Sequence, residues 1–327
     1  MYQKNWQCLL KEVITDPVEL FKQLAIDPRL LPAAQRVAQL FPLRVPAGFV
    51  ARMQKANPSD PLLQQVLPLA AEEIEAPGFS ADPLQEQSAK PLAGLLHKYS
   101  GRVLLTLTGA CAVNCRYCFR RHFPYSENIP AGEAWQSILH YIGADSSLVE
   151  VILSGGDPLL ANDHYLKKCI ADLDAIPHLK ILRIHSRLPI VLPERITTDL
   201  LDILSATRLQ TVMVTHSNHA NELDASVHAA MHRLRQRNIP LLNQSVLLKG
   251  VNDTLEALSD LSYRLFEFGI LPYYVHVLDK VQGAAHFAVD EHQAKQLCIA
   301  LREKLPGYLV PRLVYEQAGA KSKLALL

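Results

Sequence analysis

Three cysteines stand within eight residues of this sequence, in the stretch GACAVNCRYCFRRHFPY at residues 109–125. Cys111, Cys115 and Cys118 are separated by three and by two residues, and a pair of arginines follows close behind them. Six cysteines in a chain of 327 residues are too few for a disulfide scaffold. Clustered thiols in such a chain indicate metal or redox chemistry.

Two kinds of metal centre could use these thiols, and the number of ligands separates them. A structural zinc ion takes four ligands, and His122 is the conceivable fourth ligand in this loop. An electron-transfer cluster of four irons takes four thiolates, but no fourth cysteine has a suitable spacing. Three thiolates on four irons leave one iron open to another ligand, so the sequence favours a [4Fe-4S] cluster that binds a small molecule.

The composition as a whole is that of a soluble globular enzyme. Hydrophobic residues make up 49% of the chain and charged residues 20%, with a formal net charge of +1. This balance gives no reason to expect nucleic acid or a membrane surface as a partner. The first residues, MYQKNWQCLLKEVITDP, lack the apolar run of a signal peptide. We therefore expect a cytoplasmic protein.

Beyond Arg102, apolar β-rich runs alternate with amphipathic helical stretches. After the second strand, their period is about 30 residues, which is that of a βα unit. Six such units predict an α/β fold whose parallel sheet forms a partial (βα)6 TIM-like barrel, with a doubly wound open sheet as the alternative. The predicted strands cover residues 103–107, 150–154, 181–185, 211–215, 241–247 and 273–278, and the predicted helices include 163–176, 224–238, 254–269 and 290–305.

The first 95 residues have a different pattern, which predicts a mostly helical N-terminal region. Aspartate followed by proline is a helix-start signal, because the carboxylate caps the first turn and proline fits its first position. Such pairs begin at Asp16, Asp27, Asp60 and Asp82. The predicted division of the chain is a helical region at 1–95, a barrel at 96–307 and a C-terminal segment at 308–327.

Four polar clusters directly follow predicted strands. In a parallel barrel, catalytic groups lie on loops at the carboxyl ends of the strands, so these clusters predict one shared pocket. They are the cysteine loop after the first strand, SGGD (154–157) after the second, THSNHANE (215–222) after the fourth and LDKVQG (278–283) after the sixth.

The cysteine loop closely resembles that of the radical S-adenosylmethionine enzymes, in its CxxxCxxC spacing and in its aromatic residue before the last cysteine. In that family the open iron binds S-adenosylmethionine, which an electron from the cluster cleaves to a 5′-deoxyadenosyl radical. SGGD is similar to the family's Gly-Gly-Glu-type motif, and its glycines allow close approach of a ligand to the backbone. The resemblance implies a [4Fe-4S] cluster on the three cysteines and an S-adenosylmethionine site formed by Tyr117, Ser154, Gly155, Gly156, Asp157, His185, Ser186 and Arg187.

Longer stretches resemble the lysine 2,3-aminomutases, from about residue 40 onward. They are FRRHFPY, HSRLPIVLPERI, HSNHANE, LLNQSVLLKGVND and YYVHVLDKVQGAAHF. Within that family, FRRHFPY, SGGDPL and LDKVQGAAHF are most similar to the bacterial branch that acts for elongation factor P. The resemblance implies a pyridoxal-phosphate-dependent isomerase that converts L-lysine to (R)-β-lysine, which a separate lysyl ligase attaches to that factor. It also implies a reducing donor of flavodoxin or ferredoxin type.

The family carries its pyridoxal phosphate on a lysine near the C-terminus. The matching position is Lys323, seven residues after Glu316, with Lys321 as the rival. The stretch HKYSGRVLL (97–105) resembles the family segment that holds the cofactor phosphate, a dianion for which cationic side chains are natural partners. The resemblance implies that Lys98, Tyr99 and Arg102 serve this purpose.

The resemblance also implies how the substrate is held. Arg120 matches the residue that binds the substrate carboxylate, for which a guanidinium offers two parallel hydrogen bonds. Asp279 and Glu316 match the two acids that bind the distal ammonium, although Glu316 is longer than the family's aspartate by one methylene. Two acids favour a cationic substrate, and the resemblance implies that this substrate is free lysine.

The sequence leaves alternatives open for the function, the oligomeric state and one group of polar residues. An aminomutase for glutamate or arginine and a non-catalytic iron–sulfur electron carrier are the other functions, and the sequence leaves open whether the chain forms a homo-oligomer. His216, His219 and Glu222 have a spacing that could suit a metal, but the stretch resembles a family run that lines the cofactor pocket. We expect hydrogen-bonding roles for these three side chains.

Overall fold

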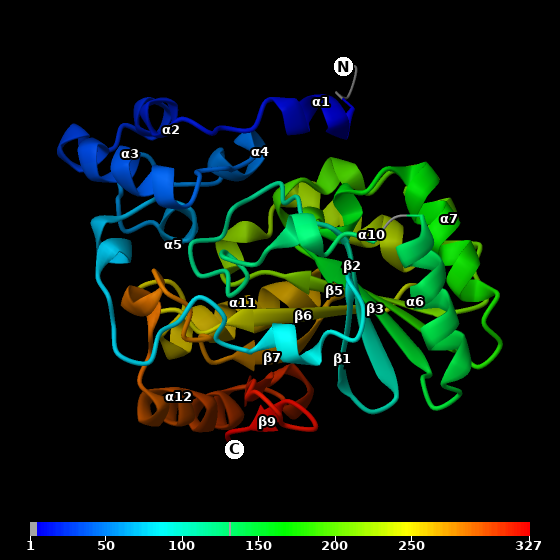
Figure 1. Cartoon of the computed structure of the whole chain (residues 1–327). Helices are drawn as coiled ribbons and strands as arrows, with labels where there is room; N and C mark the ends of the chain where they lie inside the picture. The colour runs from blue at the N-terminus through cyan, green and yellow to red at the C-terminus, as the bar shows by residue number, and fades with distance from the viewer. Residues whose placement is uncertain (1–4, 131) are drawn as a thin grey trace.

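A computed structural model describes residues 5–130 and 132–327 of the chain. Within this part of the chain, one nine-stranded sheet has the order β1 to β9, so each strand lies beside the strands that precede and follow it in the sequence (Figure 1). A doubly wound sheet reverses its strand order at a switch point. Because the order here is unbroken, the sheet winds in one direction, as in a partial barrel, and the doubly wound alternative is wrong.

All six predicted strands are confirmed, and three further strands join them. Parallel pairing runs from β2 through β8, whereas β1 and β9 pair antiparallel at the two edges. The strands are β1 (Leu95–Tyr99), β2 (Arg102–Thr108), β3 (Glu150–Gly155), β4 (Ile181–Ser186), β5 (Gln210–His216), β6 (Leu241–Val246), β7 (Leu271–His276), β8 (Arg312–Tyr315) and β9 (Leu324–Ala325).

The strands that the sequence did not predict are short or lie at the edges. Strand β1 forms a hairpin with β2 through Ser100 and Gly101, and Gly101 has a φ of 76°, which glycine adopts without strain. Strand β8 lies inside the predicted C-terminal segment and extends the parallel set to seven strands in the described residues.

Helices cover the outer face of the sheet, and α6 and α7 lie along its β2–β4 side in Figure 1. Side-chain caps begin several of them, as when Asn162, Asp224, Thr254 and Asp290 accept a first-turn N–H. After the sheet begins, the helices are α6 (Glu133–Ala144), α7 (Asp163–Asp174), α8 (Leu188–Val191), α9 (Thr198–Ser205), α10 (Ala225–Gln236), α11 (Leu255–Glu267) and α12 (Glu291–Lys304).

The N-terminal helices lie across one end of the sheet, in blue at the top of Figure 1. Asp16, Asp27 and Asp60 cap helices as predicted, whereas Asp82 begins a turn and its carboxylate accepts the N–H of Glu86. The helices of this region are α1 (Trp6–Lys11), α2 (Pro17–Leu24), α3 (Leu31–Leu40), α4 (Ala47–Val50) and α5 (Pro61–Gln64), and the short 3-10 helices η2 (Ala70–Glu73) and η3 (Glu86–Ala89) follow them.

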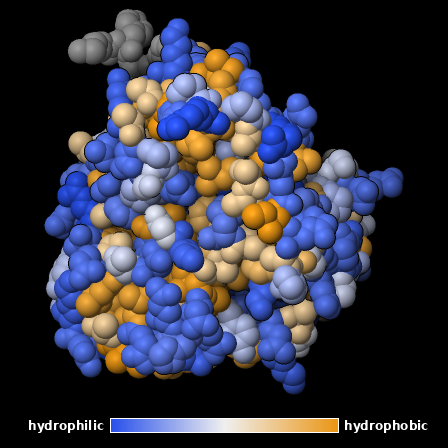
Figure 2. Space-filling model, turned by 90° about the vertical axis from the view of Figure 1, so that its left-hand side faces the viewer, coloured by the Kyte–Doolittle hydropathy of each residue, from blue (hydrophilic) through white to orange (hydrophobic). Residues whose placement is uncertain are grey.

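Apolar side chains of the N-terminal helices and of the sheet form one hydrophobic core, which includes Phe49 and Leu63 together with Leu105 and Leu153. The N-terminal region is therefore packed onto the barrel. Outside this core, hydrophilic residues surround smaller hydrophobic patches on the face seen in Figure 2. Among the described residues, no helix has the length and apolar character needed to span a membrane.

Candidate active site

A cavity of about 310 Å³ lies in the hollow of the sheet. Strands β2 to β7 each contribute side chains to it, because alternate residues of a strand face the same side. Most predicted site residues line this cavity, and Ser186 lies behind it. The lining residues among them are Lys98, Tyr99, Arg102, Cys111, Cys115, Tyr117, Cys118, Arg120, Ser154, Gly155, Gly156, Asp157, His185, Arg187, Asp279, Glu316 and Lys323.

The cysteine loop forms one wall of the cavity, with its three thiols free of disulfides. Burial raises the pKa of Cys111, and it raises the pKa of Cys118 to about 11. Buried thiolates therefore need a positive centre beside them, which iron supplies. In the described residues, no three His, Cys, Asp or Glu side chains are grouped to hold one metal ion. A four-iron cluster does not need such a grouping, because each of its thiolates binds a different iron.

His122 does not join the three thiols. Its side chain is exposed and lies outside the cavity lining, with its Nε2 3.4 Å from the carbonyl oxygen of Gln282. Among the described residues, the cysteine loop therefore offers three thiols to the cavity and no fourth ligand, which fits a cluster with one open iron better than a tetrahedral zinc ion.

The SGGD loop packs directly against the backbone of the cysteine loop. A Cβ at Gly156 would lie only 2.4 Å from the carbonyl oxygen of Ala110, so this position requires glycine. Gly155 has a φ of 115°, which also restricts the position to glycine. The N–H of Asp157 donates to the same Ala110 oxygen at 2.8 Å. Backbone contact thus fixes the relative position of the two loops.

The Asp157 carboxylate connects the loops that follow β3 and β4. It accepts hydrogen bonds from Ser186 Oγ at 2.7 Å and from the N–H groups of Arg187 at 2.8 Å and Leu188 at 3.0 Å. Burial raises its pKa to about 6, although these hydrogen bonds oppose that shift. Both oxygens are engaged by protein donors, so an ammonium group would have to share them.

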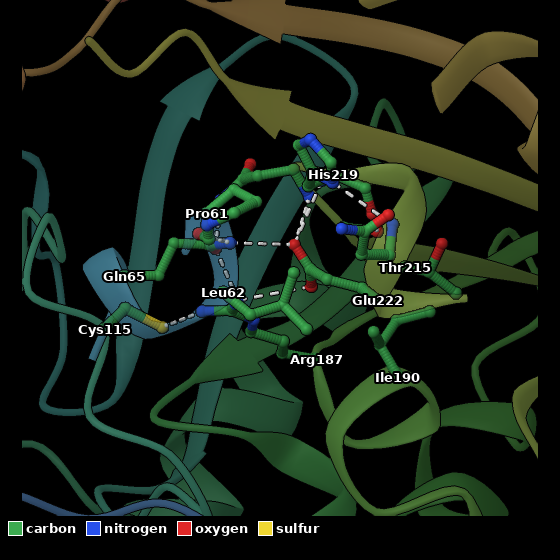
Figure 3. A network of polar contacts seen from close by, with 12 residues as sticks. Pro61, Leu62, Gln65, Cys115, Arg187, Ile190, Thr215, His219 and Glu222 are labelled. Atoms are coloured by element: carbon green, nitrogen blue, oxygen red, sulfur yellow. Dashed lines mark hydrogen bonds and ion pairs between the residues drawn. The ribbon is translucent and has the colours of Figure 1, made fainter. Parts of the chain in front are cut away.

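A polar network lies behind the cysteine loop (Figure 3). Arg187 is at its centre and donates from Nη1 to Cys115 Sγ at 2.7 Å and from Nη2 to Gln65 Oε1 at 2.7 Å. Its Nη2 is also 3.3 Å from Glu222 Oε2. Gln65 follows α5 in the N-terminal region, so this network joins that region to the barrel.

His216, His219 and Glu222 have separate partners, as expected for hydrogen-bonding roles. His216 Nε2 lies 2.9 Å from Gln244 Nε2, and burial lowers the pKa of His216 to about 3, which keeps its ring neutral. His219 Nδ1 accepts from the N–H of Asn221 at 3.2 Å. Glu222 accepts from backbone N–H groups in its own loop.

At the other end of the cavity, cations and carboxylates alternate in a chain of contacts. Lys323 is ion-paired with Glu316, whose other oxygen is 3.5 Å from Lys98 Nζ. Lys98 Nζ is in turn 3.0 Å from Glu86, which accepts two hydrogen bonds from Arg120 at 2.7 and 2.8 Å. This charge chain runs from the cysteine loop to the C-terminal segment and includes four residues that the sequence predicted.

The surroundings of Arg120 and Asp279 change how each side chain could bind a substrate. Glu86 accepts from Nε and Nη2 of Arg120, and Nη1 makes longer contacts, with Ser154 Oγ at 3.4 Å and the carbonyl oxygen of Gly155 at 3.5 Å. A substrate carboxylate would therefore reach one nitrogen of Arg120, where the sequence predicted a two-pronged contact. Burial, reinforced by the nearby Glu316 carboxylate, raises the pKa of Asp279 to about 7.

The remaining lining side chains suit a charged aromatic ligand. Lys98 and Arg102 offer positive charge, and the Arg102 guanidinium lies 5.1 Å from the centre of the Tyr99 ring. His185 Nε2 and His276 Nε2 are buried and have no hydrogen-bond partner among the described residues. Lys323 is half-buried and lines the cavity, whereas Lys321 is exposed and lies outside its lining.

Sequence comparison decides the family. A protein named L-lysine 2,3-aminomutase from Escherichia coli (strain K12) is 52% identical over 325 residues, which cover 99% of this chain and 95% of that protein. The protein of the same name from Haemophilus influenzae (strain ATCC 51907 / DSM 11121 / KW20 / Rd) is 51% identical over 321 residues, with 98% and 95% covered. The chain belongs to the lysine 2,3-aminomutase family. No family model matches the sequence.

Membership of the lysine 2,3-aminomutase family makes this chain an enzyme of the isomerase class, as predicted. It argues against the alternative of a non-catalytic electron carrier. Among solved structures, Streptococcus suis SuiB bound to S-adenosylmethionine has a TM-score of 0.50 at 14% identity, with 69% of this chain and 52% of that chain covered. This likeness concerns the fold and agrees with the partial barrel that the strand order indicates.

Several residues of this aminomutase site were missed by sequence reasoning, among them Gln65, Glu86 and His276. Glu86 and Gln65 come from the N-terminal region, where no motif marked them, and both are buried. His276 lies at the end of β7, and the alternation in YYVHV could have placed its ring on the same face as Tyr274. The two N-terminal residues had no comparable signal.

Proposed function

We propose that this chain is a radical S-adenosylmethionine isomerase that moves the amino group of L-lysine from C2 to C3 and gives (R)-β-lysine. It would use a [4Fe-4S] cluster, S-adenosylmethionine and pyridoxal phosphate. One observation carries the proposal: the three thiols and Lys323 line the same cavity, together with two carboxylates and several cations. A C-terminal lysine far from the thiols would have argued against it.

In this proposal the cysteine loop holds the cluster, and the loops around Gly156, Asp157 and Arg187 hold S-adenosylmethionine. Lys323 carries pyridoxal phosphate, whose phosphate is bound by Lys98, Tyr99 and Arg102. When bound, the cluster and S-adenosylmethionine supply a carbon-centred radical that takes hydrogen from C3, and pyridoxal phosphate supplies a conjugated group through which nitrogen migrates. The cavity residues must then orient the substrate and exclude water.

The chain's own charges support a cationic substrate such as lysine. Arg120 lines the cavity, and its Nη1, whose own contacts are 3.4 and 3.5 Å long, can bind the substrate carboxylate. Asp279 and Glu316 lie at the other end and can bind the distal ammonium, which would take the place of Lys323 beside Glu316. A glutamate substrate would bring a second carboxylate to these two acids, so the charge arrangement disfavours it.

The biological setting is inferred from the resemblance to the bacterial branch of the family. We propose that the product is used by a lysyl ligase to modify elongation factor P in the cytoplasm, and that a flavodoxin or ferredoxin reduces the cluster. In the proposed division, residues 1–95 support the cysteine loop, residues 96–307 form the barrel and residues 308–327 carry the cofactor lysine.

An anaerobic assay tests the reaction. The reconstituted protein is given both cofactors, a reductant and L-lysine, and the products are separated by chiral chromatography and identified by mass. We expect (R)-β-lysine, with far less product from L-arginine or L-glutamate in parallel reactions. Accumulation of 5′-deoxyadenosine without any β-amino acid would refute the isomerase proposal. Adding elongation factor P and its ligase to the same reaction tests the use of the product.

A further inference from the structure

Gln65 is a buried junction between the N-terminal region and three parts of the barrel. Its Oε1 accepts from Arg187 Nη2 at 2.7 Å and from Asn218 Nδ2 at 2.9 Å, and its Nε2 donates to Glu222 Oε1 at 3.1 Å. Its backbone oxygen accepts the N–H of Arg116, inside the cysteine loop, at 2.9 Å. Its side chain has no solvent exposure. One glutamine thus contacts the loops after β2, β4 and β5 (Figure 3).

These contacts fix the direction of the Arg187 guanidinium. Gln65 and Glu222 both engage Nη2, so Nη1 is the nitrogen that reaches Cys115 Sγ, at 2.7 Å. The Phe49 and Tyr117 rings are also close, with their centres 5.6 and 5.7 Å from Arg187 Cζ. The guanidinium is 5% exposed and has little room to turn while these partners remain.

Glu222 contacts Arg187 through Oε2, while its other oxygen is bound within its own loop. Its Oε1 already accepts from the N–H groups of Asn218 at 2.8 Å and His219 at 3.1 Å, so the carboxylate is fixed within its own loop. The separation of 3.3 Å between Glu222 Oε2 and Arg187 Nη2 is longer than the contact of the same nitrogen with Gln65. Gln65 therefore provides the shorter contact and links the two charged groups.

We propose that Gln65 is a positioning residue which holds Arg187 against Cys115 and thereby sets the reduction potential of the bound cluster. The inference rests on the proposed function, because it requires the [4Fe-4S] cluster. Reduction adds negative charge to a cluster, and a hydrogen bond from a cation to a ligand sulfur stabilises that charge. Arg187 in this position therefore makes the cluster easier to reduce. Gln65 would thereby link the N-terminal region to the electron-transfer step.

The experiment compares two neighbouring glutamines. Gln65→Met keeps the volume of the side chain but removes its polar contacts, and Gln64→Met is the matched control. Gln64 is the last residue of α5 and donates to the carbonyl oxygen of Pro58 at 2.6 Å, outside the Arg187 network. The full-length proteins are reconstituted anaerobically, and their clusters are titrated by electron paramagnetic resonance without S-adenosylmethionine.

We expect the midpoint potential of Gln65→Met to become more negative, with an altered spectrum of the reduced cluster, whereas Gln64→Met matches the parent. Gln65→Asn keeps an amide at the buried site but shortens its reach, so it should shift the potential the same way even if Gln65→Met fails to fold. Parental potentials and spectra in the Gln65 variants, or an equal shift in Gln64→Met, would overturn the inference. A parent protein that assembles no [4Fe-4S] cluster would overturn the proposed function as well.

Discussion

At the cysteine end of the cavity, the Arg116 and Glu72 side chains that support the loop are 0% and 1% exposed, whereas at the Lys323 end the Glu316 and Lys323 side chains keep 17% and 19%. Arg116 donates twice to Glu72, at 2.8 and 2.6 Å, and Arg121 donates to the same carboxylate at 2.9 Å. The charge chain at the other end reaches water along part of its length.

The cysteine end is therefore a fixed wall of the cavity, whose ion pairs stay in place. The Lys323 end is an exchangeable wall, whose charged groups can change partners. A buried ion pair is costly to break, because the remaining charge has no water to solvate it. A partly exposed pair costs little to rearrange. The proposed reaction needs both properties: the loop around the cluster must keep its shape, while Glu316 and Lys323 must change partners when cofactor and substrate bind.

The largest expected effect comes from removing one ligand group at each end. Cys118→Ala should lose its iron and all isomerase activity but still bind pyridoxal phosphate. Lys323→Ala should retain its iron but lose the covalently held cofactor, and Lys321→Ala should behave like the parent. Iron content, the absorbance of the bound cofactor and peptide mapping after borohydride reduction measure these properties. Trapping of the cofactor on Lys321 would contradict the assignment of Lys323.

A second prediction concerns the buried charges behind the cysteine loop. Glu72→Gln leaves Arg116 and Arg121 without a carboxylate, so it should destabilise the protein by roughly 3 kcal/mol, near the cost of breaking a buried ion pair. Glu73→Gln, at the neighbouring position, removes an exposed pair with Arg36 and should leave stability nearly unchanged. Thermal and denaturant unfolding of the two variants provide the measurement. Equal stability of Glu72→Gln and Glu73→Gln would show that the buried contacts of Glu72 do not make the cysteine end rigid.

Glu86 lies where the two walls meet, and its replacement should affect substrate binding. Glu86→Gln weakens the contacts that orient Arg120 and Lys98, so the KM for lysine should rise about tenfold, because a hydrogen bond to a charged group contributes roughly 1.5 kcal/mol. We expect a smaller change in kcat. Glu75→Gln, at an exposed position of the same region, is the control. A lower KM in Glu86→Gln would mean that Glu86 competes with the substrate for Arg120.

The smallest expected effect is a pH dependence of lysine binding. Because the pKa of Asp279 is raised to about 7, its carboxyl keeps its proton at lower pH and offers a negative charge only as the pH rises. The ionised fraction falls about threefold between pH 7.5 and pH 6.5, and lysine affinity should fall with it. Titration of the cofactor-loaded protein with lysine, followed by absorbance, measures this. Asp279→Asn should bind lysine weakly at both pH values.

The sequence predicted the parts of this molecule that depend on local pattern. Strands such as β4 and β5 follow from apolar runs, the cysteine loop that includes Cys111 stood out by its spacing, and the family resemblance pointed to Lys323, which lines the cavity. The roles of Gln65, Glu72 and Glu86 could not be predicted in this way, because they arise from contacts with residues far along the chain. Gln65 and Glu222, for example, are 157 positions apart. No spacing within a short stretch encodes such a pair, so these supports became visible only in the folded chain.

The strand next to Lys323 has a consequence for how the cofactor enters. Strand β9 consists of two residues, paired with β8 through Leu324 and Ala325, so few backbone hydrogen bonds hold the segment in place. Segments held in this way open locally at small cost in free energy. Release of this segment would expose Lys323 to a cofactor in solution while the cysteine loop stays closed. Amide hydrogen exchange should therefore be faster at Leu324 than in the central strands, and it should slow when the cofactor is bound.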